Sequence, residues 1–127
     1  MTAKRIFISF AAPEDNYARD FLVGQARNNH SPFEFVDMSV KEPWSDSWKT
    51  SCRTKIKGCD GFIALLSKYT VNSLGAKWEM KCAKEEGIPL IGLQISSTAP
   101  GTIPPELNNQ KVIYWTWDEI AKFIRSL

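Results

Sequence analysis

Residues 73–87 read Ser73-Leu74-Gly75-Ala76-Lys77-Trp78-Glu79-Met80-Lys81-Cys82-Ala83-Lys84-Glu85-Glu86-Gly87, and they predict a helix. The segment has few β-branched residues, and Gly87 stands where a left-handed cap would end the helix. Steps of three and four residues place Trp78, Cys82 and Ala83 on one apolar stripe, and Glu79 falls inside it. The stretch therefore predicts a carboxylate on the core-facing side of a helix.

Two interpretations of Glu79 are open at this point. Desolvation on an apolar stripe raises the pKa of a carboxyl group, and such groups are often site residues. Alternatively, Glu79 lies at the end of the stripe and reaches water or a basic partner. The helix alone does not separate the two.

The size and charge of the chain limit the classes of function. A chain of 127 residues is expected to form one domain, residues 1–127. The formal charge is +2, from 16 basic and 14 acidic residues without charge blocks, which argues against nucleic acid or anionic lipid as partner. No apolar run has membrane-spanning length, and Met1-Thr2-Ala3-Lys4-Arg5 leads into a strand instead of a signal peptide.

The cysteines and the histidine indicate neither a metal site nor His-based catalysis. Cys52, Cys59 and Cys82 form no C-x-x-C pair, and they are most simply buried thiols in a reducing, cytoplasmic setting. His30, the single histidine, lies in a predicted polar turn. We therefore expect no bound metal.

Apolar runs predict five strands that alternate with four helices. The strands are expected at 4–10, 33–37, 61–66, 89–95 and 111–114, with the run at 61–66 central and the one at 33–37 at or near an edge. Helices are expected from Pro13, from Trp48 to Gly58, at 73–87 and after Thr116, which begins a capping box. The inner face of the first helix is assigned to Tyr17, Ala18, Phe21, Leu22 and Gln25. Residues 96–110 are expected to form a long surface loop.

This alternation predicts an α/β fold, a flavodoxin-like three-layer sandwich. Its five-stranded parallel sheet has the order 2-1-3-4-5, with helices on both faces. Ligands of such sheets bind outside the carboxyl ends of the strands, near the switch point between strands one and three. Phe10-Ala11-Ala12, Asp37-Met38-Ser39 and Ser67-Lys68-Tyr69 are expected there, close to the helix of Glu79.

The order of these segments resembles TIR domains. The run 5–10 with Glu14-Asp15 resembles their opening strand and acidic turn, and residues 56–67 resemble their segment from a helix into the third strand. Trp78-Glu79 with residues 87–92 resembles the segment that holds the catalytic glutamate of NAD-cleaving TIR enzymes. The TIR-like branch of the Thoeris antiphage system is similar in Phe35-Val36-Asp37-Met38-Ser39-Val40 and in Pro104-Pro105-Glu106-Leu107.

The resemblance implies an enzyme with NAD as substrate and no resident cofactor. It would release nicotinamide and form ADP-ribose or a cyclic isomer that signals to a downstream effector. One departure is that NAD-cleaving TIR domains often have Trp four residues before the catalytic Glu, where this chain has Gly75. Nicotinamide leaves as a neutral group, so one carboxylate facing the developing ribosyl cation suffices, and Glu79 is the candidate.

Other residues are candidate substrate contacts, each with a structural alternative. Phe10, Trp48 and Trp78, and also Trp44, could stack on a base or pack in the core. Asp37 could bind a ribose hydroxyl or a lysine, or cap a loop, and Ser67 could contact substrate or cap the next helix. The substrate-binding set is Phe10, Ala11, Asp37, Trp48, Ser67 and Trp78. No Gly-rich phosphate loop indicates a Rossmann binding mode.

Two other functions compete with the enzyme. The chain could be a non-catalytic module that self-associates or binds other TIR domains through the aromatic loop 38–48. A phosphorylatable receiver domain shares the fold and needs an Asp after strand three and a Lys after strand five. Ser67 follows the third strand here and no Lys ends the strand at 89–95, so the receiver is disfavoured.

Overall fold

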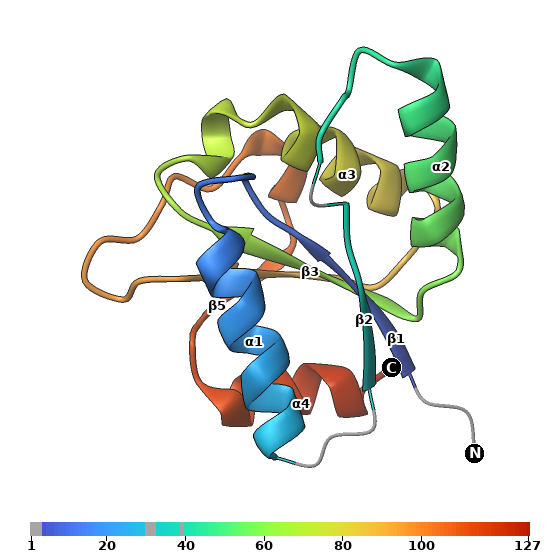
Figure 1. Ribbon diagram of the computed structural model, residues 1–127. Helices are drawn as coiled ribbons and strands as arrows, with labels where there is room; N and C mark the ends of the chain where they lie inside the picture. The colour runs from blue at the N-terminus through green and yellow to red at the C-terminus, as the bar shows by residue number, and fades with distance from the viewer. Residues whose placement is uncertain (1–3, 30–32, 39) are drawn as a thin grey trace.

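The computed structural model describes residues 4–29, 33–38 and 40–127, and it contains one five-stranded parallel sheet (Figure 1). The strand order is β2-β1-β3-β4-β5, and every neighbouring pair is parallel, which confirms the predicted architecture. The strands are β1 Lys4–Ser9, β2 Phe33–Val36, β3 Gly61–Leu66, β4 Leu90–Gln94 and β5 Lys111–Tyr114. The helices are α1 Asn16–Asn28, α2 Asp46–Lys57, α3 Leu74–Glu85 and α4 Trp117–Arg125, with short 3-10 turns η1 Thr70–Asn72 and η2 Pro105–Leu107.

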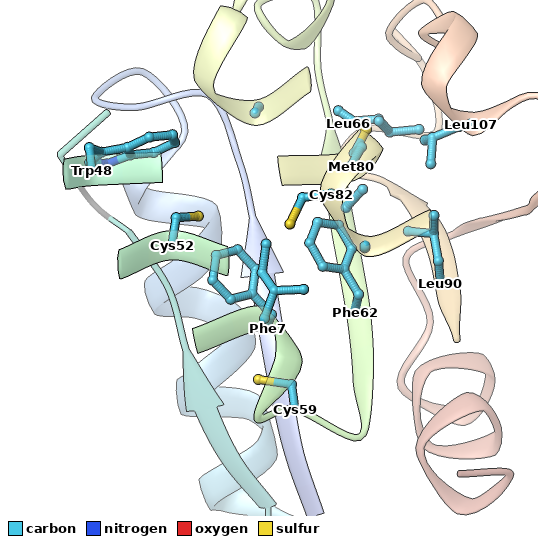
Figure 2. Packing of buried hydrophobic residues seen from close by; sticks show 14 residues of the cluster. Phe7, Trp48, Cys52, Cys59, Phe62, Leu66, Met80, Cys82, Leu90 and Leu107 are labelled. Atoms are coloured by element: carbon cyan, nitrogen blue, oxygen red, sulfur yellow. The ribbon is translucent and has the colours of Figure 1, made fainter. Parts of the chain in front are cut away.

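Helices cover both faces of the sheet and divide the core into two clusters (Figure 1). Alternate residues of a strand point to opposite faces, so Ile6 and Ile8 of β1 join the cluster under α1 and α4. Phe7 joins the cluster under α2 and α3, where its ring stacks on Phe62 with centroids 5.3 Å apart (Figure 2). Each strand of the sheet interior thus contributes side chains to two separate packing layers.

The positions of the strands follow their burial patterns. Every residue of β3 is buried, as predicted for a central strand covered on both faces. β2 has partly exposed residues throughout and lies at the edge of the sheet, also as predicted. The apolar pattern of each run therefore indicates how deep in the sheet it lies.

Helix α3 forms as its sequence predicts. Ser73 is the N-cap, and its hydroxyl accepts a hydrogen bond from the backbone N–H of Ala76. Gly87 adopts a φ of +69°, a left-handed conformation that favours glycine. The apolar side of α3 packs on the sheet, with Met80 and Cys82 in the cluster shown in Figure 2.

Helix α1 differs from the prediction in its start and its inner face. It begins at Asn16 instead of Pro13, because the preceding residues form a turn in which the Asp15 N–H bonds to the Ala11 carbonyl. The helix buries Ala18, Leu22 and Ala26, whereas Tyr17 and Phe21 are 63 % and 61 % exposed. The assignment of Tyr17 and Phe21 to the core was wrong, because the neighbouring stripe, Ala18, Leu22 and Ala26, faces the sheet instead.

Two loop predictions also need correction. Helix α2 begins at Asp46, two residues before the expected start at Trp48, because the Ser45 hydroxyl caps it by accepting from the Trp48 N–H. The last residues of the expected loop 38–48 are therefore helical. The loop 96–110 is not wholly at the surface, because η2 inserts Leu107 into the core beside Met80 (Figure 2). Cys59 lies just beyond α2, and Cys52, Cys59 and Cys82 are buried free thiols as predicted.

Some predictions lie outside the described residues. These are the N-terminal residues 1–3, the polar turn around His30 and the loop residue Ser39. Within the residues that are described, no helix is long and apolar enough to cross a membrane.

Candidate active site

Glu79 is fully buried at the carboxyl edge of the sheet, where β1 and β3 end. Its relative exposure is 0 %, and both of its carboxylate oxygens lie 2.8 Å from the Lys41 Nζ. The hydroxyl of Ser9, the last residue of β1, donates to Glu79 Oε1 at 2.7 Å. The Cys52 thiol from α2 lies 3.9 Å from Oε2. The carboxylate predicted on the core-facing stripe therefore faces inward and is bound by groups from three other segments.

Lys41 comes from an irregular segment, residues 40–45, which we call the strap. The strap crosses the first turn of α3 at Gly75, where a Cβ atom would lie 2.7 Å from the Lys41 Cβ. The Trp48 indole N–H holds the strap by donating to the Val40 carbonyl at 2.8 Å. Val40 and Trp44 are 67 % and 75 % exposed, whereas the Lys41 side chain is only 8 % exposed. Lys41 is thus the inward-pointing anchor of an otherwise exposed strap.

The electrostatics of Glu79 combine two opposing effects. Burial raises the pKa of Glu79 above its usual value, while the Lys41 ammonium and the Ser9 hydroxyl lower it and only partly offset the burial. Burial also raises the pKa of Cys52, and the neighbouring Glu79 charge adds to that increase. The thiol is therefore a neutral neighbour of the carboxylate at physiological pH.

Phe10 and Asp37 belong to the same polar cluster as Glu79. The Phe10 ring is buried and lies 4.6 Å from Lys41 Nζ and 5.3 Å from the Arg19 guanidinium carbon. Arg19 in turn binds Asp37 Oδ2 at 2.8 Å. Asp37 was expected to bind a ribose hydroxyl or a lysine, or to cap a loop. In the structure it binds a basic side chain, which is an arginine and not a lysine. The Phe10 ring therefore contacts two cations, Arg19, which is paired with Asp37, and Lys41, which is paired with Glu79.

The other predicted site residues lie apart from this cluster. Ser67 donates to Asp15 Oδ2 at 2.5 Å and accepts from the Tyr69 N–H, so it ties the loop after β3 to the start of α1. Ala11 is buried, and its carbonyl closes the turn before α1. Burial raises the pKa of Asp15, with the Ser67 hydroxyl opposing the shift. These groups line the same sheet edge but do not touch Glu79.

Trp48 and Trp78 pack against each other and not against Glu79. Their rings meet edge to face with centroids 5.4 Å apart, and the Arg53 guanidinium carbon lies 5.5 Å from the Trp78 centroid. Trp48 is 6 % exposed and lies at the margin of the core, near Cys52 in Figure 2. Both indoles hold the strap and α2 against α3.

Sequence reasoning missed Lys41, Ser9 and Arg19. Ser9 could have been recognised from the sequence, because it is the one hydroxyl side chain in β1 and ends an otherwise apolar, buried run. Lys41 carried no such signal, because it lies in an irregular segment 38 residues before its partner. Its position depends on the path of the strap over Gly75.

Comparison with known proteins identifies the family. The family model for the TIR-like domain of the Thoeris protein ThsB matches residues 7–100. The chain belongs to this TIR-like family. The resemblance to the Thoeris branch is thereby confirmed for β1 through β4, while residues 104–107, part of that resemblance, lie beyond the matched range. Comparison with curated proteins returns no match.

Solved structures support the TIR-like fold. The TIR domain of the Toll-related receptor TRR-2 from Hydra magnipapillata is similar with a TM-score of 0.71 and 17 % identity, over 94 % of this chain and 97 % of that one. A prokaryotic SEFIR domain is similar with a TM-score of 0.57 and 14 % identity, over 98 % and 89 % of the two chains. At these identities the likeness concerns the fold.

Proposed function

We propose that this TIR-like domain cleaves the nicotinamide–ribose bond of NAD, with Glu79 as its catalytic carboxylate. The observation that carries the proposal is the pairing of a fully buried Glu79 with a positive charge at the switch point of a parallel sheet. At that edge the Lys41 ammonium already lies against the Glu79 carboxylate. A ribose that loses nicotinamide also becomes a cation.

The chemistry needs little beyond this carboxylate. The C1′–N bond breaks, its electron pair leaves with neutral nicotinamide, and positive charge develops on the ribose ring. Glu79 would stabilise that charge, and Ser9 would orient the carboxylate through its 2.7 Å hydrogen bond. Water attack at C1′ yields ADP-ribose and a proton. Attack by a group of the same ADP-ribose yields a cyclic isomer.

The Lys41 ammonium is bound to the Glu79 carboxylate in this structure, so the proposed reaction requires the strap to move. The Lys41 ammonium already interacts with both the Glu79 carboxylate and the Phe10 ring. The substrate cation would replace it there, with Phe10 and Glu79 as its neighbours. Asp37 would act indirectly, by holding Arg19 against the Phe10 ring.

Nicotinamide release, followed by chromatography, tests the proposal. The protein would be incubated with NAD alone and in lysate from phage-infected cells, because the family name points to Thoeris antiphage defence. Glu79→Gln keeps the volume of the side chain and removes its charge, and we expect nicotinamide release to fall by about 100- to 1,000-fold. Lys41→Ala uncovers the carboxylate, and we expect faster release than in the wild type.

A matched control is Glu119→Gln, which removes an exposed carboxylate on α4. It should release nicotinamide at the wild-type rate. The proposal is wrong if folded Glu79→Gln cleaves NAD as well as Glu119→Gln does. It is equally wrong if neither the wild type nor Lys41→Ala releases nicotinamide in any lysate.

A non-catalytic interaction module is the second candidate, and the exposed strap favours it. Trp44 and Val40 present large apolar surface in the segment 38–48, while Glu79 is closed off by Lys41. Self-association through this segment would be lost in Trp44→Ala, as sedimentation would show. An effector that responds to a nucleotide product would not be activated by such a module.

A further inference from the structure

A polar and aromatic groove lies on the outer face of α3. Its volume is about 420 Å³, and it runs between the strap and η2. Its lining includes Trp44, Leu74, Lys77, Trp78, Lys81 and Glu106. The α3 members are spaced by three and four residues and so form one helix face, whereas Glu79 is fully buried on another face. Trp78, which was expected on the same stripe as Glu79, lies on the groove face instead. The groove is therefore separate from the Glu79 site.

The groove offers aromatic surface to solvent. Trp44 is 75 % exposed and Leu74 is 68 % exposed, among the largest exposures of apolar side chains in the described chain. A tryptophan projecting from an irregular strap exposes a flat face on which a planar ring can stack. The remaining apolar lining comes from Pro43 and from Trp78, which contacts Trp48 and Arg53.

Two positively charged side chains also line the groove. Lys77 and Lys81 lie one turn apart on α3, and like charges at this spacing destabilise a helix. Among the residues that the structure describes, neither ammonium forms an ion pair. An anion bound between them would remove the repulsion.

Glu106 supplies the third element, an acceptor without a donor. Its Oε1 atom is buried and has no hydrogen-bond partner within the described chain. A buried oxygen without a partner is uncommon and costs free energy, which a donor from a ligand would recover. An aromatic wall, a pair of cations and the side chain of Glu106 thus line one groove of small-molecule size, with the unpartnered Glu106 Oε1 atom buried behind the groove surface.

We propose that this groove binds a purine nucleotide whose base carries an exocyclic amine, at a site distinct from that of Glu79. The base would stack on Trp44, its amine would donate to Glu106, and the phosphate would lie between Lys77 and Lys81. The three ligand groups match the three chemistries of the groove. The binding is reversible and does not depend on NAD cleavage.

Calorimetry with adenosine monophosphate tests the proposal on the wild-type chain. This probe has no nicotinamide and is not cleaved by the proposed reaction, but it is the adenylate half of NAD, so the groove variants are needed to assign its binding to the groove. We expect saturable binding below millimolar concentration, and at least about 10-fold weaker binding of adenosine and of inorganic phosphate, since each lacks one of the groups. Trp44→Ala and Lys77→Ala/Lys81→Ala should each weaken binding by about 10-fold or more.

Matched controls remove similar groups elsewhere. Tyr114→Ala deletes an exposed aromatic side chain on β5, and Lys57→Ala/Lys122→Ala deletes two exposed lysines from α2 and α4. Both should bind adenosine monophosphate as the wild type does. Equal binding by the groove variants and these controls would overturn the proposal, as would the absence of binding at millimolar concentration.

The role of Glu106 has its own readout. Purine riboside 5′-monophosphate lacks the exocyclic amine, and we expect the wild type to bind it more weakly than adenosine monophosphate. In Glu106→Ala the two nucleotides should bind equally, because the acceptor that distinguishes them is gone. A preference for the amine that persists in Glu106→Ala contradicts the assigned orientation.

Discussion

The two faces of the sheet are packed with different chemistry. Under α1 and α4 the buried cluster is aliphatic apart from Phe10, with residues such as Ile8, Leu65 and Ile124. Under α2 and α3 the cluster contains the stacked Phe7 and Phe62 and all three cysteines (Figure 2). Glu79 of α3 is also buried. One face is an ordinary core, and the other encloses a charged pair.

The difference shows where a core can tolerate a carboxylate. A buried charge is costly unless it is paired and hydrogen-bonded. Glu79 meets this condition only because Lys41 and Ser9 reach it at the carboxyl edge, where strands end and the strap passes over α3. We therefore expect the α1/α4 face to govern stability and the α2/α3 face to govern activity.

The largest effect on stability is expected on the aliphatic face. Ile124 of α4 is 0 % exposed, so Ile124→Ala leaves a cavity and should lower the free energy of unfolding by about 2–5 kcal/mol. Urea titration would measure this loss. Nicotinamide release per folded molecule should stay at the wild-type level. A folded Ile124→Ala protein with altered release would show that the two faces are not independent.

An intermediate effect is expected at Lys41. Lys41→Met removes the ammonium that lowers the pKa of Glu79, so that pKa rises further above its ordinary value of 4.5. The folded state then binds a proton more tightly than the unfolded state, and stability falls as the pH rises above 4.5. We expect a loss of about 1–3 kcal/mol at pH 8 that shrinks towards pH 5, measured by urea titration at each pH.

The double variant Lys41→Met/Glu79→Leu is the control for this prediction. It removes both charges, so its stability relative to the wild type should vary less between pH 5 and pH 8, about the range in which native proteins are usually most stable. An equal loss in Lys41→Met at both pH values would show that Glu79 is not the titrating group.

The smallest expected change in stability comes from substituting one glycine on each face of the sheet. At Gly24 of α1 a Cβ atom would meet nothing within 4 Å, so Gly24→Ala should stabilise the protein by about 0.5–1 kcal/mol. At Gly75 of α3 the same atom would lie 2.7 Å from the Lys41 Cβ, so Gly75→Ala should cancel or reverse that gain. Thermal unfolding distinguishes the two. Equal stabilisation would mean that the strap does not pack on α3 in solution.

Local sequence patterns predicted the strands, their order and the place of Glu79 on an apolar stripe, and they left open whether Glu79 reaches a basic partner, as it does in the structure. The continuous apolar run of β3 indicates a strand covered on both faces, and the helical spacing around Trp78, Glu79 and Cys82 indicates a carboxylate among core residues. The caps at Ser73 and Gly87 are equally local, because they satisfy backbone groups within one turn.

The tertiary structure decided which groups meet Glu79. Lys41, Ser9 and Cys52 come from an irregular strap, a strand end and another helix, and no periodicity links their positions in the chain. It also decided that α1 exposes Tyr17 and Phe21, since two stripes one residue apart fit the same apolar spacing and only the packed sheet selects between them. Periodicity records which side of an element is buried, whereas the partner across the interface depends on the path of the whole chain.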